Sequence, residues 1–243
     1  MAERNLAICK AFNIAGFPAV ALLVAMSSAH PVLAQGQSTT FTPPAGCTAY
    51  LTTQNRGCTV AHHWICEADP QGNHWRLMAD GDGPFYLSYS DSEFRWLQSW
   101  DLRAGTQSRL LEPEEDPASM SELFETGTDS MVFSLVREQD DMIEQRDYTG
   151  FDALTGESVI VDGHELEVTS FSYEYDTGLG PRQTSGTQYV SRDWRLFFGG
   201  IETVVLPSGE SFEYDNSPAE FAEPGEAGFL TMQPIYDCGE IMS

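Results

Sequence analysis

Segments of alternating apolar and polar residues recur along this chain, and turn-forming residues separate them about every 8–12 residues. Two of these turns are DPQG at 69–72 and DGDG at 80–83. Strands joined by tight turns pair antiparallel with their neighbours. The spacing therefore predicts a mainly β fold, an antiparallel meander forming a curled sheet or open barrel. We expect residues 47–243 to form this single β-rich domain.

The clearest hairpin signal lies in the C-terminal half. Residues 159–161 and 164–168 flank Asp162-Gly163, a dipeptide that suits a type I′ turn. A change of phase in the next alternating residues predicts a β-bulge near Thr169-Ser170. Gly199-Gly200 also separates two alternating triplets, and it is interpreted as the turn of another hairpin.

One short helix is predicted at 117–126 (PASMSELFET). Asp116 can cap it, Pro117 suits the first helical position, and Gly127 suits the end. Three other stretches carry no clear strand pattern. They are a charged run at 112–116, interpreted as a solvated loop, a charged excursion at 138–147, and an irregular tail at 216–243.

Residues 1–34 have the features of a secretory signal peptide. A cationic start with Arg4 and Lys10 precedes an apolar stretch, and VLA at 32–34 offers small residues where signal peptidase cuts. The apolar run is too short and interrupted to favour a membrane span, which needs about 20 apolar residues. We therefore expect a periplasmic or secreted protein that starts at Gln35 with a mobile polar leader, 35–46.

The expected mature chain is strongly acidic. The full sequence has 12 Lys+Arg and 37 Asp+Glu, a formal charge of −25. The signal peptide removes Arg4, Lys10 and Glu3, so 10 cations face 36 acids, the charge becomes −26, and no lysine remains. Such a chain should repel nucleic acid and anionic lipid. Because the acids are scattered, we favour a salt-tolerant surface over a dedicated cation-binding surface.

Four cysteines follow the signal peptide, an even number that predicts two disulfides in an exported chain. Cys58 and Cys66 would lie about 26 Å apart on one extended strand, too far to be bridged. A two-residue turn at Arg56-Gly57 would place Cys47 opposite Cys66. We therefore favour Cys47–Cys66 and Cys58–Cys238. The other pairings stay open if the strand at 58–67 is broken.

A local metal site is not favoured. The mature histidines are His62, His63, His74 and His164. Neighbours on a strand point to opposite faces, and the turn at 69–72 would place His74 near Glu67, about 13–17 Å from the other two. The acidic turn at 80–83 lacks the remaining ligands of a calcium loop, since Pro84 and Asp91 stand at its fifth and twelfth positions. No metal or cofactor is predicted, although a distant histidine partner is left open.

No catalytic residue can be assigned from motifs. The sequence has no G-x-S-x-G elbow, P-loop or G-x-G-x-x-G fingerprint. Aromatic residues on the expected strands are favoured as core, while a curled sheet could also use them to line an apolar cavity. These aromatics are Trp64, Trp75, Trp96, Trp100, Trp194, Phe171, Tyr173, Tyr175, Phe197 and Phe198.

Three short segments carry a resemblance. RGCTV at 56–60, DWRLFF at 193–198 and YDCG at 236–239 resemble uncharacterised exported proteins of marine alphaproteobacteria, from which no activity carries over. Residues 148–175 are also similar to the strand-rich middle of periplasmic lipoprotein-carrier proteins. That resemblance implies a sheet around an apolar cavity, but the cysteines and the 138–147 insertion are not part of it.

These features favour a non-enzymatic exported β protein that binds an apolar or amphipathic molecule, or a partner in the envelope. Its ligand-binding residues are unknown from the sequence. One alternative is an envelope interaction module with a packed core and an exposed aromatic patch. Another is a hydrolase, which requires a cleft where a histidine, a serine or an acid pair converge.

Overall fold

The computed structural model describes residues 39–239, so the predicted signal peptide and the first leader residues, 35–38, lie outside the described residues. The described residues belong to one compact unit, Gln37–Ser243. They form one antiparallel sheet and one short helix, which confirms the mainly β fold. The strands are β1 Cys47–Asn55, β2 Thr59–Cys66, β3 His74–Asp80, β4 Gly83–Ser90, β5 Trp96–Asp101, β6 Thr106–Asp116, β7 Thr128–Gln139, β8 Met142–Val161, β9 His164–Asp176, β10 Pro181–Ser191, β11 Leu196–Phe198, β12 Ile201–Val205, β13 Ser211–Asp215 and β14 Pro218–Ala222; the helix is α1 Met120–Thr126.

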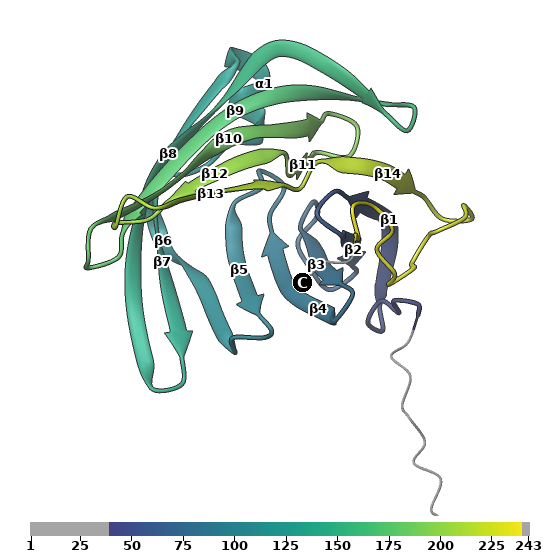
Figure 1. Cartoon of the computed structure of the whole chain (residues 1–243), viewed down its shortest axis with the longest axis horizontal. Coiled ribbons are helices and arrows are strands. Elements are labelled where there is room, and N and C mark those ends of the chain that lie inside the picture. Colours follow the sequence, from purple (N-terminus) through teal and green to yellow (C-terminus); the bar gives the residue numbers. More distant parts are fainter. Residues whose placement is uncertain (1–38, 240–243) are drawn as a thin grey trace, which may run out of the picture. The chain divides into compact units, whose positions relative to one another are not determined.

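The strands follow the predicted meander for most of their length (Figure 1). Each strand from β1 to β10 pairs with the next one along the chain. At one end of the sheet β12 pairs with β10 and β13 with β12, and at the other end β14 pairs with β1. Consecutive pairing of this kind is what short, turn-separated strands favour.

The sheet is neither closed nor strongly curled, which corrects the expectation of a curled sheet or open barrel. No ladder joins β13 to β14 among the described strands, so the sheet is not closed. Only Asn216 and Ser217 separate the two strands, and β14 continues from the end of β13 instead of returning alongside it (Figure 1). Strands placed end to end cannot exchange ladder hydrogen bonds.

The first hairpin has the predicted register for a reason that the sequence pattern did not reveal. Asn55 pairs with Thr59, so the turn contains three residues, not the expected two. The extra residue shifts the register, and an irregularity between Ala49 and Leu51 shifts it back. Cys47 consequently lies opposite Cys66, as the two-residue turn had predicted.

The structure contains the disulfides Cys47–Cys66 and Cys58–Cys238, with Cα atoms 4.0 and 4.7 Å apart. This is the favoured connectivity. Disulfides persist in oxidising compartments outside the cytoplasm. No helix among residues 39–239 is long and apolar enough to cross a membrane.

The Asp162-Gly163 turn is confirmed, since Val161 pairs with His164 and both turn residues have positive φ values, 49° and 85°. The bulge predicted near Thr169-Ser170 was assigned to the wrong strand of this hairpin. The irregularity lies in the partner β8, between Leu154 and Ser158. A change of phase records a break in the ladder, and either of the paired strands can supply it.

Gly199-Gly200 is not a hairpin turn. β11 and β12 both pair with β10, one after the other along its length, and the two glycines join them. A Cβ atom at Gly200 would lie 2.2 Å from the Thr187 carbonyl oxygen, so only glycine allows the strands to approach so closely here. A close approach and a turn leave the same Gly-Gly signal in a sequence.

The predicted helix is present but starts later. α1 begins at Met120, and its N-cap is Ser119, whose hydroxyl accepts a hydrogen bond from Glu122 N–H. Asp116 ends β6 instead, while Gly127 ends the helix with φ 87° as expected. Hydroxyl and carboxylate caps compete in such a sequence, and the one nearest the apolar turn is used.

Three stretches that carried no clear strand pattern contain strands. The excursion at 138–147 is the tip of the β7–β8 hairpin, and the tail contains β14. The charged run at 112–116 belongs to β6, where residues 112–115 bulge out of the ladder with β7. Backbone pairing with a neighbouring strand overrides weak local preference in each case.

Two apolar clusters form the core. The larger one joins β1 to β9, β11 and β14 through Leu51, Leu166, Leu196, Phe198 and Phe221. The smaller one lies on β7 and β8 around Phe133 and Tyr148. The leader is not free from Thr39 onward, because Phe41 N–H donates to the Leu230 carbonyl and its ring stacks on His62.

Candidate functional site

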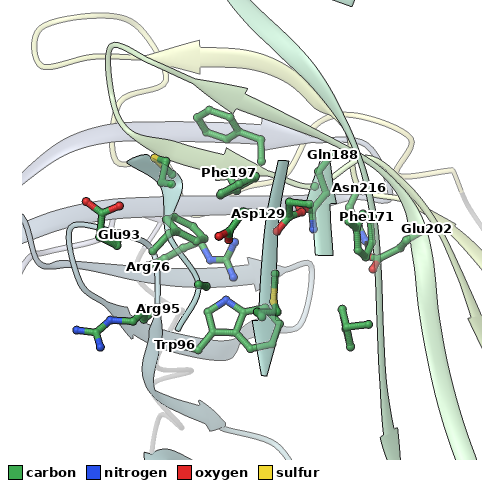
Figure 2. A pocket seen from close by; sticks show the side chains of 18 of the residues that line it. Arg76, Glu93, Arg95, Trp96, Asp129, Phe171, Gln188, Phe197, Glu202 and Asn216 are labelled. Atoms are coloured by element: carbon green, nitrogen blue, oxygen red, sulfur yellow. Dashed lines mark hydrogen bonds between the residues drawn. The ribbon is translucent and has the colours of Figure 1, made fainter. Parts of the chain in front are cut away.

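A cavity of about 370 Å³ lies between the two clusters. Side chains from each of the strands β1 to β12, from the segment before β5, from the start of α1 and from Asn216 after β13 line it. In Figure 2, Glu93 and Arg95 lie at one side of the view, Glu202 and Asn216 lie at the other, and Arg76 and Asp129 lie between them. The volume is within the range of about 300–1,000 Å³ that is common for small-molecule sites.

Half of the aromatic residues that the sequence singled out line this cavity. Phe133, which the sequence did not single out, joins them, and edge-to-face contacts at about 6 Å hold Trp96 against Phe133 and Tyr173. Trp96 is 38% exposed, which places it at the mouth, whereas Phe171 is 5% exposed and lies deep. The aromatic lining comprises Tyr86, Phe94, Trp96, Phe133, Phe151, Phe171, Tyr173, Phe197 and Phe198.

The other predicted aromatics do not reach the cavity. Trp64 and Trp75 are register partners, and their rings stack with centroids 6.1 Å apart on the face of β2–β3 opposite to the cavity. Trp100 continues the stack at 5.8 Å from Trp75. Trp194 packs into the larger core cluster, and Tyr175 packs against Tyr148. These five aromatic residues therefore contribute to packing, which is the interpretation that the sequence favoured.

A row of carboxyl groups crosses the wall formed by β7 to β12. Asp129 of β7 pairs with Asp152 of β8, which pairs with Phe171 of β9. Phe171 pairs in turn with Gly186 of β10, which pairs with Glu202 of β12. Paired residues point to the same face of a sheet, so this row lines the cavity with three acids around one aromatic ring.

Burial raises the pKa values of two acids in this row, Asp129 and Asp152. Burial raises the pKa of Asp152 to about 7, and neighbouring Asp129 adds to the shift. Burial also raises the pKa of Asp129 to about 6. One oxygen of Asp129 accepts a 2.9 Å hydrogen bond from Ser119 N–H, while Oδ1 is buried without a partner. Both carboxyl groups thus carry a proton far more readily near neutral pH than an exposed aspartate does.

The opposite wall carries a cation. Arg76 of β3 lies directly across the ladder from His63 of β2, and both side chains line the cavity. Burial lowers the pKa of His63 well below its usual range, and the charge of Arg76 adds to this, so His63 is neutral. The nearest partner of His63 is the Thr53 hydroxyl at 3.5 Å. Arg76 has the Tyr86 ring 5.9 Å from its guanidinium carbon.

The charged residues before β5 are structural. Arg95 donates to Asp91 at 2.6 Å and to Glu114 at 3.0 Å. Glu93 accepts hydrogen bonds from Ser121 N–H and Arg195, which ties this segment to α1 and to the turn before β11. With their bonding capacity used within the protein, these groups form a fixed edge of the cavity.

The remaining predicted positions do not converge. His62 lies on the face opposite to His63, as expected. The β2–β3 ladder ends at the pair Trp64–Trp75, so His74 does not pair with Glu67 and instead pairs with Ser90 of β4. Burial lowers the pKa of both His62 and His74 to about 4. Asp80 is ion-paired with Arg103 at 2.6 Å. Within the part of the chain that the structure describes, no three His, Cys, Asp or Glu side chains are grouped as a metal site requires.

Sequence reasoning missed Arg76, Asp129 and Asp152. Arg76 is the one cation in the alternating segment HWRLM, and that was its only local signal. The two aspartates gave no usable signal, because they are two among the 37 acidic residues of the sequence. Their proximity depends on the exact register of the β7–β8 hairpin, part of which was interpreted as a charged excursion.

No protein-family model, characterised protein or solved structure matches this chain.

Proposed function

We propose that this chain is an exported protein of the periplasm or the extracellular medium, and that it binds an apolar or amphipathic small molecule in the cavity. The observation that carries the proposal is the lining: buried aromatic and other apolar side chains lie beside many polar and charged ones, around a volume of about 370 Å³. Binding sites for small molecules commonly combine an apolar wall with a few polar groups that orient the ligand.

The site is also built to keep its form. The edge near Glu93 is fixed by ion pairs, and the β1–β2 hairpin behind His63 carries both disulfides. A preformed cavity lowers the entropic cost of ordering side chains when a ligand binds. Export is supported by the signal-peptide pattern at 1–34 and by the two disulfides.

Binding can be tested with the neutral fluorescent probe N-phenyl-1-naphthylamine. We expect one probe per chain by native mass spectrometry and a blue-shifted emission. Ala118 lines the cavity, so Ala118→Trp should fill it and reduce probe affinity at least about tenfold. The matched control is Ala104→Trp in the exposed β5–β6 turn, which should bind as the natural protein does.

Met131→Trp provides a second filling variant, on the cavity-lining strand β7, and circular dichroism establishes that each variant is folded. Unchanged probe binding in both folded variants would contradict the proposal and favour an envelope module without a small-molecule site. Export is tested separately, by recovering from the periplasm a chain that starts at Gln35.

A hydrolase is not the function that the geometry favours. Asp129 and Asp152 form an acid pair in the cavity, which is one of the features that a hydrolase would need. However, the hydroxyl bonded to His63 belongs to Thr53, which is itself buried, and no described serine hydroxyl is hydrogen-bonded to a histidine.

A further inference from the structure

Arg76 differs from most other arginines of the protein. The described residues contain ten arginines, and seven of them form ion pairs with aspartate or glutamate. Arg76 forms no ion pair within 4.0 Å and no side-chain hydrogen bond to any described residue. In a chain with 36 mature acids, a cavity arginine without a carboxylate partner is unexpected.

The surroundings of Arg76 make this isolation costly. Its Nε is buried without a hydrogen-bond partner, and the residue across the ladder, His63, is neutral. Glu202 is close enough to influence Arg76 electrostatically but does not contact it, and accepts a 3.0 Å hydrogen bond from Asn216 instead. Arg76 is partly buried as a residue, and charges withdrawn from water are normally paired, because losing hydration without gaining a counter-charge is unfavourable.

An external carboxylate would complete this arrangement. The planar guanidinium matches a carboxylate with two parallel hydrogen bonds, and one negative charge balances one arginine. A doubly charged head group would be repelled by Glu202, which stands on the opposing wall. The aromatic rings around Phe171 would then hold the apolar part of the same molecule.

We propose that the ligand is an apolar monocarboxylate whose head group pairs with Arg76. This inference rests on the proposed function, since it assumes that the cavity is a binding site. It adds the chemical nature of the head group and the sign of its charge, which the apolar lining alone does not specify.

The test compares three ligands with the same ten-carbon chain: decanoate, decanol and decylammonium. Titration calorimetry with the oxidised protein should give decanoate an affinity at least about tenfold higher than that of decanol, with decylammonium weakest. Arg76→Met should remove the preference for decanoate and leave decanol binding within about twofold. The control is Arg182→Met, because Arg182 also lacks an ion pair but does not line the cavity.

A thermal melt of the empty protein separates a binding role from a structural one. If Arg76 is kept for a ligand, Arg76→Met should raise the melting temperature, because an apolar side chain replaces an unpaired charge. The inference is overturned if the variant melts lower, if it keeps the preference for decanoate, or if the natural protein binds decanol or decylammonium as tightly. If none of the three ligands binds, the proposed function itself fails.

Discussion

The β1–β2 and β8–β9 hairpins have the same topology, but different interactions hold them. Both disulfides end on β1–β2 or its turn, and most of its residues are buried. By contrast, β8 is 20 residues long, and neither β8 nor β9 contains a disulfide-bonded cysteine. Apolar side chains of β8 such as Ile160 are exposed. The wall that carries the cation therefore has covalent support, while the wall that carries the acids depends on its turn and on packing.

The largest effect should come from the disulfide that closes the longer loop. Cys58–Cys238 spans 180 residues, so the double variant Cys58→Ser, Cys238→Ser should lose about 5 kcal/mol in the free energy of unfolding. Cys47–Cys66 spans 19 residues, and its removal should cost about 3 kcal/mol. Urea unfolding measures both. Equal losses would show that loop length does not determine the covalent contribution here.

The acid wall should be sensitive to pH instead. The pKa of Asp152 is about 7 in the folded protein and near its ordinary value when unfolded, so the folded state holds more protons between about pH 4 and 7. Below that window the Asp152 carboxyl is protonated in both states and does not destabilise the fold. As the pH rises through the window, ionisation of Asp152 lowers the free energy of unfolding. Asp152→Asn should therefore stabilise the protein by up to about 4 kcal/mol at pH 8 and hardly at all at pH 4.

Chemical denaturation at both pH values measures this difference. Asp141→Asn is the control, since Asp141 is exposed in the β7–β8 turn. A stabilisation of the same size at pH 4 would refute the pH argument, because it would mean that ionisation of the Asp152 carboxyl does not destabilise the folded protein.

The smallest effect concerns the turn that the β8–β9 hairpin depends on. Gly163 has φ 85° with open space around it, so Gly163→Ala should cost about 1 kcal/mol from backbone strain alone. Gly81 also has open space but no positive φ, and Gly81→Ala should be close to neutral. Thermal melts compare the two, and equal effects would show that the Asp162-Gly163 conformation does not limit the stability of this hairpin.

The parts of the fold that could be predicted depend on local chemistry. Asp162-Gly163 identified its hairpin because few dipeptides adopt two positive φ values. The Cys47–Cys66 pairing was predicted with two offsetting errors, a turn one residue too short and a missed irregularity at Tyr50. The prediction of the disulfide was still right, because the two errors cancel and leave Cys47 opposite Cys66.

The candidate site could not be predicted in the same way. The carboxyl row needs the registers of four successive ladders to be right at once, and one of them skips β11 to reach β12. A single error of one residue turns a side chain to the other face. The isolation of Arg76 is also a property of three-dimensional packing, because nothing in HWRLM distinguishes it from an arginine that finds a carboxylate.

The Cys58–Cys238 bond also determines how the molecule would respond to tension. A pull applied beyond Cys238 passes through the disulfide to Cys58 and then along β1, or along β2 and the Cys47–Cys66 bond, so the chain between Cys66 and Cys238 carries no load. That shielded loop contains β3 to β14 and most of the cavity lining. Stretched by its ends, the oxidised protein would lengthen by little more than its outer segments, and a reductant would release the rest.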